Sequence, residues 1–262
     1  MASYETLRVD RDDGIATVTL DTNADRNGVT MKLTDDLVSL AAAVGEDPDV
    51  RCLVLTHEGP FFSVGADLSE FAGDASDATY LREIAGRLHE AIVQFHQAEV
   101  PILGAIDGIA AGSGFSMAVL PDIVLLSEDA RLEYAYPRIG LSGDGGATYF
   151  LPRLLGLRKA QEIVLLDEPI DPDDALEMGL ATDVVPTDEF AARRDELARS
   201  LAAGPTEALG KNKRLMAESF DTSLESQLAA ETEALADVAK TDDFARGYAA
   251  FFEDDDPEFT GQ

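Results

Sequence analysis

The strongest constraint on the fold is a pair of glycine-rich turns, each following a strand-like apolar run and leading into a helix-like run. The first lies in "FFSVGADLSEF", residues 61–71, and the second in "DGIAAGSGFSMAVL", residues 107–120. Glycine lets two backbones approach closely, and the first N–H groups of a helix have no partner within that helix. One such turn is typical of tight helix packing. Two of them, both between strands, predict stacked α/β layers with amide groups open to a ligand.

Short strand-like runs alternate with helix-like runs in the first three quarters of the chain. "YETLRVDRDDGIATVTLD" predicts two strands joined by an Asp-Gly turn, and the apolar spacing over Tyr80–Ala98 predicts a helix. A further helix is predicted near 157–166. Only helix patterns follow Asp188, and Gly204 and Pro205 interrupt them. We therefore expect an α/β core over residues 1–203 and a C-terminal helical region over residues 204–262.

The charge of the chain excludes several classes of partner. Its 262 residues carry 20 Lys and Arg against 51 Asp and Glu, a formal net charge of −31. Such a surface repels nucleic acid and anionic membranes, and its self-repulsion is tolerable only where salt screens it. We expect a halophilic protein, and folding and activity without molar salt would contradict that expectation.

Other features predict a cytoplasmic protein that binds neither membrane nor metal. The N-terminal "MASYETLRVD" does not resemble a secretory signal, and no apolar run has the length of a membrane span. The single cysteine, Cys52, fits a reducing compartment. His57, His89 and His96 lack metal-ligand spacing and are interpreted as structural or surface groups.

The two glycine-rich turns resemble those of the crotonase (enoyl-CoA hydratase/isomerase) superfamily. "FSVGADLSEF" is similar to its first oxyanion loop, and "GIAAGSGFSMAVLPDIVLLSEDARL" is similar to its second. "LPRLLGLRKAQEIVLLDEPIDPDDALEMGLATDVVP" and "DFARGYAAFFEDDDPEFTG" extend the resemblance over nearly the whole chain.

The resemblance implies a crotonase-type spiral of strand–strand–helix turns and a C-terminal helical trimerisation region. It also implies a homotrimer or a dimer of trimers that acts on an acyl-CoA thioester, in fatty acid metabolism, without a further cofactor. The backbone N–H groups of Ala66 and Ser113 become the two oxyanion donors, flanked by Gly65, Gly112 and Gly114. Each such donor contributes about 2.7–4 kcal/mol to transition-state stabilisation.

Two departures from the family pattern argue against ordinary hydration. Hydratases of this family carry two glutamates, because adding water needs one group to activate the water and another to manage the α-carbon proton. Here Ser116 stands at the first position, and Arg138 follows Pro137 at the second.

"RIGLSGDGGATYFLPRLLG" resembles the isomerase branch instead, in which an acid occupies the position of Asp144. Moving a double bond from the 3-enoyl to the 2-enoyl position needs only one base, because the same group removes the C2 proton and returns it at C4. Asp144 has a second interpretation, the N-cap of a helix that begins near Gly146, which stabilises a helix by about 1 kcal/mol. The family often has proline where this chain has Gly143.

Four further residues are candidates for substrate binding. The resemblance places Arg26 near the CoA phosphates, and an exposed surface arginine explains this residue equally well. Lys213, with Lys211, is a candidate contact of the 3′-phosphate, but solvated helix charges are the favoured interpretation of both lysines. Asp67 follows Ala66 and is expected to order the first loop, and Ser116 lies just beyond the second.

The sequence thus favours an enoyl-CoA isomerase that uses Asp144 as its acid/base group. One alternative is an enoyl-CoA hydratase, a lyase, with non-standard acids. The other is a scaffold that binds CoA esters without turnover, which an acid near the oxyanion loops disfavours.

Overall fold

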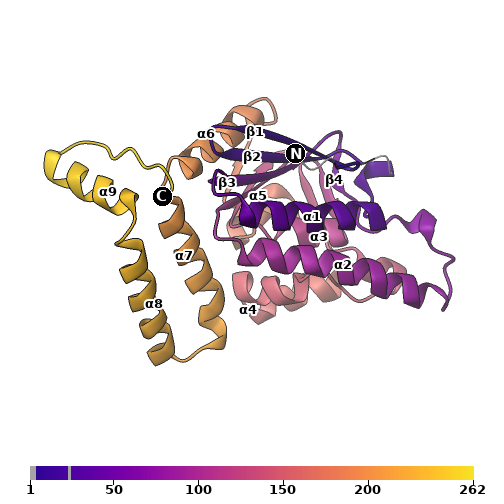
Figure 1. Ribbon diagram of the computed structural model, residues 1–262. Coiled ribbons are helices and arrows are strands. Elements are labelled where there is room, and N and C mark those ends of the chain that lie inside the picture. The colour runs from indigo at the N-terminus through magenta and orange to yellow at the C-terminus, as the bar shows by residue number, and fades with distance from the viewer. Residues whose placement is uncertain (1–3, 23–24) are drawn as a thin grey trace.

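The structure is a computed structural model that describes residues 4–22 and 25–262 (Figure 1). The strands are β1 Leu7–Asp12, β2 Ile15–Leu20, β3 Cys52–His57, β4 Phe61–Ser63, β5 Ile102–Ile106, β6 Ile109–Ala111, β7 Ile123–Ser127, β8 Arg131–Glu133 and β9 Asp183–Val185. The α-helices are α1 Met31–Glu46, α2 Asp77–Gln97, α3 Ser113–Ala118, α4 Ala147–Leu166, α5 Pro172–Met178, α6 Phe190–Ala202, α7 Thr206–Glu218, α8 Leu224–Val238 and α9 Asp242–Glu253. Short 3-10 helices are η1 Asp25–Asn27, η2 Leu68–Glu70, η3 Tyr136–Ile139 and η4 Ser219–Asp221.

The strands form two sheets, and from β3 onward successive strands contribute alternately to them. The larger sheet has the order β1-β2-β3-β5-β7-β9, in which only β1 and β2 pair antiparallel, and the smaller has the order β4-β6-β8. The expected Asp-Gly hairpin is confirmed at Asp13 and Gly14, whose φ angles of 45° and 77° suit a tight turn. Each β-pair with its helix is one turn of a crotonase-type spiral, so the expected fold class is confirmed.

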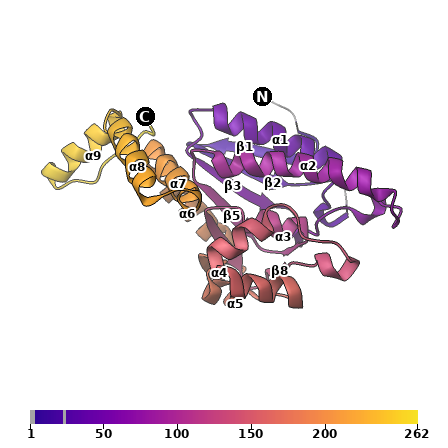
Figure 2. The ribbon, with the colours of Figure 1, turned by 90° about the horizontal axis from the view of Figure 1, so that it is seen from below.

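The main core lies between the larger sheet and the helices α1 and α2, which run side by side in Figures 1 and 2. Helix α1 begins after Thr30, whose Oγ1 accepts a hydrogen bond from Leu33 N at 3.2 Å. Helix α2 buries Ile84, Leu88 and Phe95, as the apolar spacing predicts. A smaller cluster covers the opposite face of the sheet, where burial raises the pKa of the Cys52 thiol to about 12 and keeps it unreactive.

Helix α4 differs from its predicted extent. A helix is expected near 157–166, but α4 begins at Ala147. Its first half buries Phe150 and Leu151, and Gly156 then departs from helical geometry with φ 75° and ψ 158°. The apolar pattern is out of phase across that break, which is why the sequence indicates two helices, one beginning near Gly146 and one near 157–166, and not the single helix α4.

The helices α7, α8 and α9 lie to one side of the α/β layers in both views (Figures 1 and 2). Large apolar side chains remain exposed on them, among them Leu224, Leu235 and Phe251. The boundary at residue 204 and the role of this region in trimer formation stay predictions.

The described residues include no helix that is both long and apolar enough to cross a membrane. They also include no group of three or more His, Cys, Asp or Glu side chains placed to hold a metal ion.

Candidate active site

The two glycine-rich loops lie against each other because the strands that precede them, β4 and β6, are parallel neighbours in the smaller sheet. A Cβ atom on Gly65 would lie 2.9 Å from Ala111 O and 3.0 Å from Ser113 N. A Cβ atom on Gly114 would lie 2.2 Å from Ser63 O. Both positions therefore require glycine, and the contact fixes the first loop against the start of α3.

The contact brings together two backbone N–H groups that have no acceptor within the part of the chain that the structure describes. Val29 bridges the residues on both sides of Ala66, donating to Gly65 O at 2.7 Å and accepting from Asp67 N at 3.0 Å. The Ala66 N–H is consequently directed away from Val29. Ser113 is the first residue of α3, so its N–H has no helical acceptor. Their role as the two oxyanion donors stays a prediction.

The Asp144 side chain points into the protein rather than capping a helix. The N-cap of α4 is Gly146, and the Asp144 carbonyl oxygen, not its carboxylate, accepts from Ala147 N at 3.3 Å. The Tyr136 hydroxyl donates to Asp144 Oδ1, and His89 Nε2 lies 3.8 Å from Asp144 Oδ2. The N-cap interpretation of Asp144 is therefore wrong.

Asp144 is also joined to the second loop. Ser116 Oγ donates to the Asp144 carbonyl oxygen at 2.8 Å, and Ser116 lies three residues beyond Ser113 on α3, a rise of about 4.5 Å. The Asp144 side chain is 30% exposed, so its carboxylate is reachable. The structure thus brings Asp144, Ser113 and Ala66 into one region.

Tyr136 is a hydrogen-bond donor to this carboxylate. Its burial, followed by the negative charge of Asp144 and the hydrogen bond to it, raises the pKa of the Tyr136 hydroxyl far above its ordinary value. The hydroxyl therefore keeps its proton at any physiological pH.

The two positions at which hydratases of the family carry glutamates are occupied differently here. Ser116 is fully buried, and a Cβ atom on Gly145 would lie only 2.7 Å from Ser116 Cβ, so no room remains for a longer side chain. Arg138 forms ion pairs with Glu133 and, at 2.8 Å, with Asp167, whose side chains are mostly buried. These contacts give both residues a structural role.

The packing of Tyr134 explains why glycine occupies position 143. A Cβ atom at this position would lie 2.0 Å from the Tyr134 hydroxyl oxygen. Tyr134 is fully buried, so the family's proline cannot occur here without displacing that hydroxyl.

Of the remaining residues predicted to bind substrate, three lie at the glycine-rich loops and one, Lys213, contacts other elements. Gly112 is the N-cap of α3, and Asp67 orders the first loop by accepting from Ser69 N at 3.0 Å. The Arg26 guanidinium lies over the Phe61 ring, 5.4 Å from its centroid, next to that loop. Lys213 is different, because its ammonium pairs with Asp122, just before β7.

Lys213 Nζ lies 2.9 Å from Asp122 Oδ2 and donates to the carbonyl oxygens of Phe95 and Val100. Asp122 precedes β7, whereas the glycine-rich loops follow the carboxyl ends of β4 and β6. Only 11% of the Lys213 side chain is exposed. This ammonium joins α7 to the core, and the expected contact of Lys213 with the 3′-phosphate stays a prediction.

Sequence reasoning misses His89 and Tyr136. His89 is expected to be a structural or surface group, but its Nε2 accepts from Gly145 N at 3.1 Å and faces Asp144. Tyr136 belongs to none of the sequence motifs described above. The sequence indicates only that His89 is next to Leu88, one of the apolar residues that α2 buries. The tertiary structure alone shows which segment packs beside His89.

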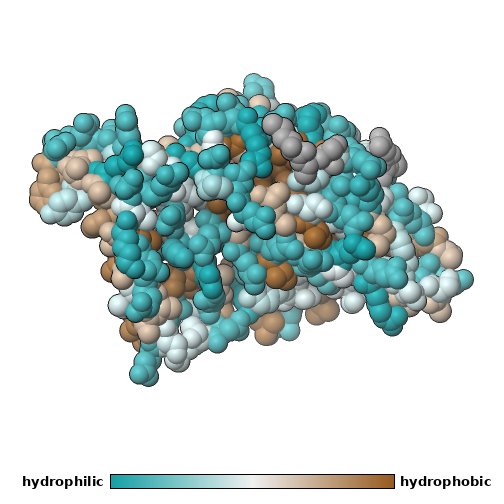
Figure 3. Space-filling model, in the orientation of Figure 1, coloured by the Kyte–Doolittle hydropathy of each residue, from teal (hydrophilic) through white to brown (hydrophobic). Residues whose placement is uncertain are grey.

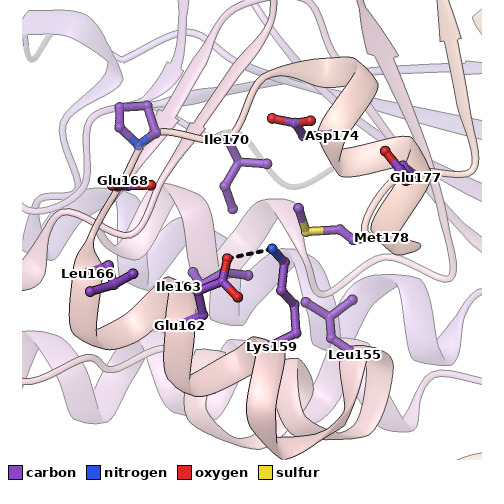
Figure 4. Close-up of a pocket in the computed structure, with 11 residues that line it drawn as sticks. Leu155, Lys159, Glu162, Ile163, Leu166, Glu168, Ile170, Asp174, Glu177 and Met178 are labelled. Carbon is purple, nitrogen blue, oxygen red and sulfur yellow. Dashed lines mark hydrogen bonds and ion pairs between the residues drawn. The ribbon is translucent and has the colours of Figure 1, made fainter.

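Two other hollows lie away from this site. One of about 510 Å³ lies between α4 and α5, where Lys159 pairs with Glu162 among further acidic side chains (Figure 4). Another of about 540 Å³ lies between α7 and α9, and its lining includes the aromatic side chains of Phe244, Tyr248, Phe251 and Phe252. The face drawn in Figure 3 is mostly hydrophilic, with scattered apolar patches over both the C-terminal helices and the α/β layers.

The chain belongs to the enoyl-CoA hydratase/isomerase family, whose model matches residues 10–262. It is 34% identical to a probable enoyl-CoA hydratase of Rhodobacter capsulatus over 99% of this chain and 100% of that protein. It is 30% identical to the 1,2-epoxyphenylacetyl-CoA isomerase of Escherichia coli (95% and 96% covered) and 32% identical to a 4-chlorobenzoyl coenzyme A dehalogenase of Arthrobacter (84% and 80% covered).

Solved structures agree with this assignment. The crystal structure of a putative enoyl-CoA hydratase from Streptomyces coelicolor has a TM-score of 0.93 at 31% identity, with 100% of this chain and 96% of that chain covered. This protein is accordingly an enzyme of the enoyl-CoA hydratase/isomerase family, in which the named relatives catalyse several different reactions.

Proposed function

We propose that this protein is an acyl-CoA isomerase that converts 3-enoyl-CoA to 2-enoyl-CoA, with Asp144 as its single acid/base group. The observation that supports the proposal is that Ser116, three residues beyond Ser113 on α3, holds the Asp144 backbone carbonyl oxygen at 2.8 Å, while positions 116 and 138 carry no second carboxylate.

The reaction balances with these groups alone. Asp144 takes the proton from C2, and the electron pair of that C–H bond moves into a dienolate whose charge lies on the thioester oxygen. The N–H groups of Ala66 and Ser113 stabilise this oxygen, each by about 2.7–4 kcal/mol. Protonated Asp144 then returns the proton at C4. Coenzyme A is part of the substrate, and no further cofactor takes part.

The test compares 3-enoyl-CoA and 2-enoyl-CoA as substrates in high salt, for the wild-type protein and Asp144→Asn. We expect conversion of the first substrate and a loss of roughly 10²–10⁴ in the variant, the usual contribution of a general base. Glu90→Gln is the matched control, because Glu90 is an exposed carboxylate next to His89 on α2. Rapid hydration of 2-enoyl-CoA would establish the hydratase alternative, and tight binding without turnover would establish the scaffold.

His89 favours a second candidate function. An isomerase needs one base, yet a second basic group lies 3.8 Å from Asp144 Oδ2. A carboxylate can also act as a nucleophile, and a neighbouring imidazole can then activate water to hydrolyse the ester that forms. The relative named 4-chlorobenzoyl coenzyme A dehalogenase makes an aromatic halide the substrate to try.

In that reaction Asp144 would attack the ring carbon and chloride would leave with the bonding electrons. Water would then cleave the aryl ester, with His89 taking the water proton. A single turnover in ¹⁸O-water separates this route from direct hydrolysis, because the first product takes its oxygen from unlabelled Asp144. Absence of chloride release from 4-chlorobenzoyl-CoA would eliminate this candidate.

We further propose that the enzyme works as a homotrimer or a dimer of trimers assembled through the C-terminal helices. Mass measurement in high salt, with a truncation after residue 203 for comparison, tests that assembly.

A further inference from the structure

Tyr136 is held more firmly than a tyrosine in a loop usually is. It is the first residue of η3 and only 8% exposed, and its ring packs against Tyr134 with centroids 5.0 Å apart. The preceding residue, Ala135, has a left-handed backbone with φ 63°, and Asp167 Oδ1 accepts from its N–H at 2.7 Å. The Tyr136 ring therefore has little freedom to rotate away from Asp144.

The protons around Asp144 can be assigned one by one. Ser116 Oγ donates its proton to the Asp144 carbonyl oxygen at 2.8 Å. The Tyr136 hydroxyl, 3.2 Å from Ser116 Oγ, then has its proton free for Asp144 Oδ1. A hydrogen bond from a buried donor to an ionised carboxylate is among the stronger kinds. Oδ1 is thus engaged by the protein.

Asp144 Oδ2 has a different environment. The nearby His89 Nε2 lies 3.8 Å away and already accepts from Gly145 N at 3.1 Å, so a neutral His89 has no proton to give to Oδ2 from that nitrogen. Tyr134 also faces this carboxylate, but its hydroxyl lies against the Gly143 backbone. Tyr136, Tyr134 and His89 are the titratable groups facing Asp144 among the described residues.

We infer that Tyr136 is the positioning residue of Asp144: its hydroxyl occupies Oδ1 and leaves Oδ2 as the one oxygen that takes and returns the substrate proton. This inference rests on the proposed function. A proton that leaves C2 and returns at C4 stays on one oxygen, so the carboxylate does not have to rotate between the two half-reactions. A hydroxyl donates a stronger hydrogen bond to a carboxylate than to a neutral acceptor, so the removal of this hydroxyl should be visible in the pH profile of the reaction.

Tyr136→Phe keeps the ring and its packing and removes only the hydroxyl. We expect kcat to fall on the order of 10-fold and its acid limb to move to higher pH by about one unit, with KM nearly unchanged. The shift should persist when His89→Gln is added, since it originates in Tyr136. Tyr134→Phe is the matched control: it removes the neighbouring buried hydroxyl and should leave the pH profile where it is.

A second variant keeps the test valid if Tyr136→Phe folds poorly. Site-specific 3-fluorotyrosine at position 136 retains the hydroxyl but makes it a stronger donor, so the acid limb should move to lower pH. Opposite shifts in the two variants support the inference. An unchanged acid limb in both, or equal shifts in Tyr136→Phe and Tyr134→Phe, would overturn it.

A measurement without substrate separates this inference from the proposed function. In protein with ¹³C-labelled aspartate carboxyls, the resonance absent from Asp144→Asn belongs to Asp144. It should titrate at higher pH in Tyr136→Phe than in the wild type. If that shift occurs but 3-enoyl-CoA is not converted, the proposed reaction fails and the positioning role survives. If isomerisation occurs and the resonance does not shift, the positioning role fails alone.

Discussion

Gly112-Ser113-Gly114 and Gly143-Asp144-Gly145 have the same appearance in the sequence, one polar residue between two glycines ahead of a helix. In the first segment the helix begins at Ser113 itself, the side chain is 5% exposed, and the group left free is the backbone N–H. In the second segment α4 begins only at Ala147, and the group left reachable is the Asp144 carboxylate. A glycine pair therefore indicates close approach of the backbone, but not which group of the residue between them is presented.

Ser113→Pro should give the largest effect on the first segment. Proline is well tolerated at the first position of a helix, but it has no N–H and places a ring carbon where the oxyanion would bind. We expect kcat/KM for 3-enoyl-CoA to fall by roughly 10²–10³, with an almost unchanged thermal unfolding curve. Ser113→Ala keeps the amide and should stay within a few-fold of the wild type. Equal activity of the two variants would remove Ser113 from the oxyanion hole.

Gly143→Ala tests the packing of the second segment. The new methyl group would collide with the Tyr134 hydroxyl, so we expect a loss of about 1–3 kcal/mol in the free energy of unfolding. Adding Tyr134→Phe should restore part of this loss, which a double-mutant cycle by chemical denaturation measures. Gly45→Ala is the control, because its methyl group meets nothing within 4 Å inside α1. Additive effects of the two substitutions would show that Tyr134 does not dictate Gly143.

Arg138→Glu tests whether a glutamate at position 138, where hydratases of the family carry one, gives this protein hydratase activity. The new carboxylate would face Glu133 and Asp167, which Arg138 now neutralises, and like charges at mostly buried side chains repel. We expect a loss of about 1–2 kcal/mol in stability and no gain in hydration of 2-enoyl-CoA. Arg138→Gln separates loss of the ion pairs from the added repulsion. A marked rise in hydration would instead give position 138 a place in the site.

The smallest expected effect is a pH dependence of the free energy of unfolding. It originates where α2 packs against α4, the helix that follows the second segment. His96 of α2 packs against Tyr149 and Phe150, with ring centroids 6.0 and 5.3 Å apart. Burial, and then the positive charge of Lys213, lower the pKa of His96 below its ordinary 6.5, while Asp122 partly opposes the shift. As the pH falls through 6.5, the unfolded chain binds a proton before the folded chain does, so stability decreases until the pH passes the lowered value.

This loss should be under ~1 kcal/mol and absent in His96→Phe, which keeps the aromatic contacts. Denaturant midpoints at pH 7 and pH 5.5 in constant high salt provide the measurement. The same decrease in both proteins would assign it to other groups.

The spiral could be predicted because its signals are local. Asp13-Gly14 specifies a hairpin, Thr30 caps α1, and the apolar stripe of α2 matches the face that it buries. Gly65, Gly112 and Gly114 likewise indicate that the two loops pack closely against each other. At Gly65 and Gly114 a side chain would collide with the backbone of the other loop. The extent of α4 could not be predicted, because Gly156 divides it into two helical pieces with different buried faces.

The candidate site could be predicted only in part, since its backbone portion is local and its side-chain portion is not. His89, Ser116, Tyr136 and Asp144 come from four separate segments, and no spacing rule links them. Lys213 shows the same limit: its position in the sequence favours a solvated helix charge, but its side chain is only 11% exposed and its ammonium pairs with Asp122.

The sequence by itself determined the alternation of strands and helices, the two glycine-rich loops and the presence of one acid in the segment after them, because propensity, periodicity and glycine conformation act over a few residues. Only the tertiary structure decided that Asp144 turns inward to Tyr136 instead of capping α4, because that choice depends on a hydroxyl and a histidine that folding brings from other elements.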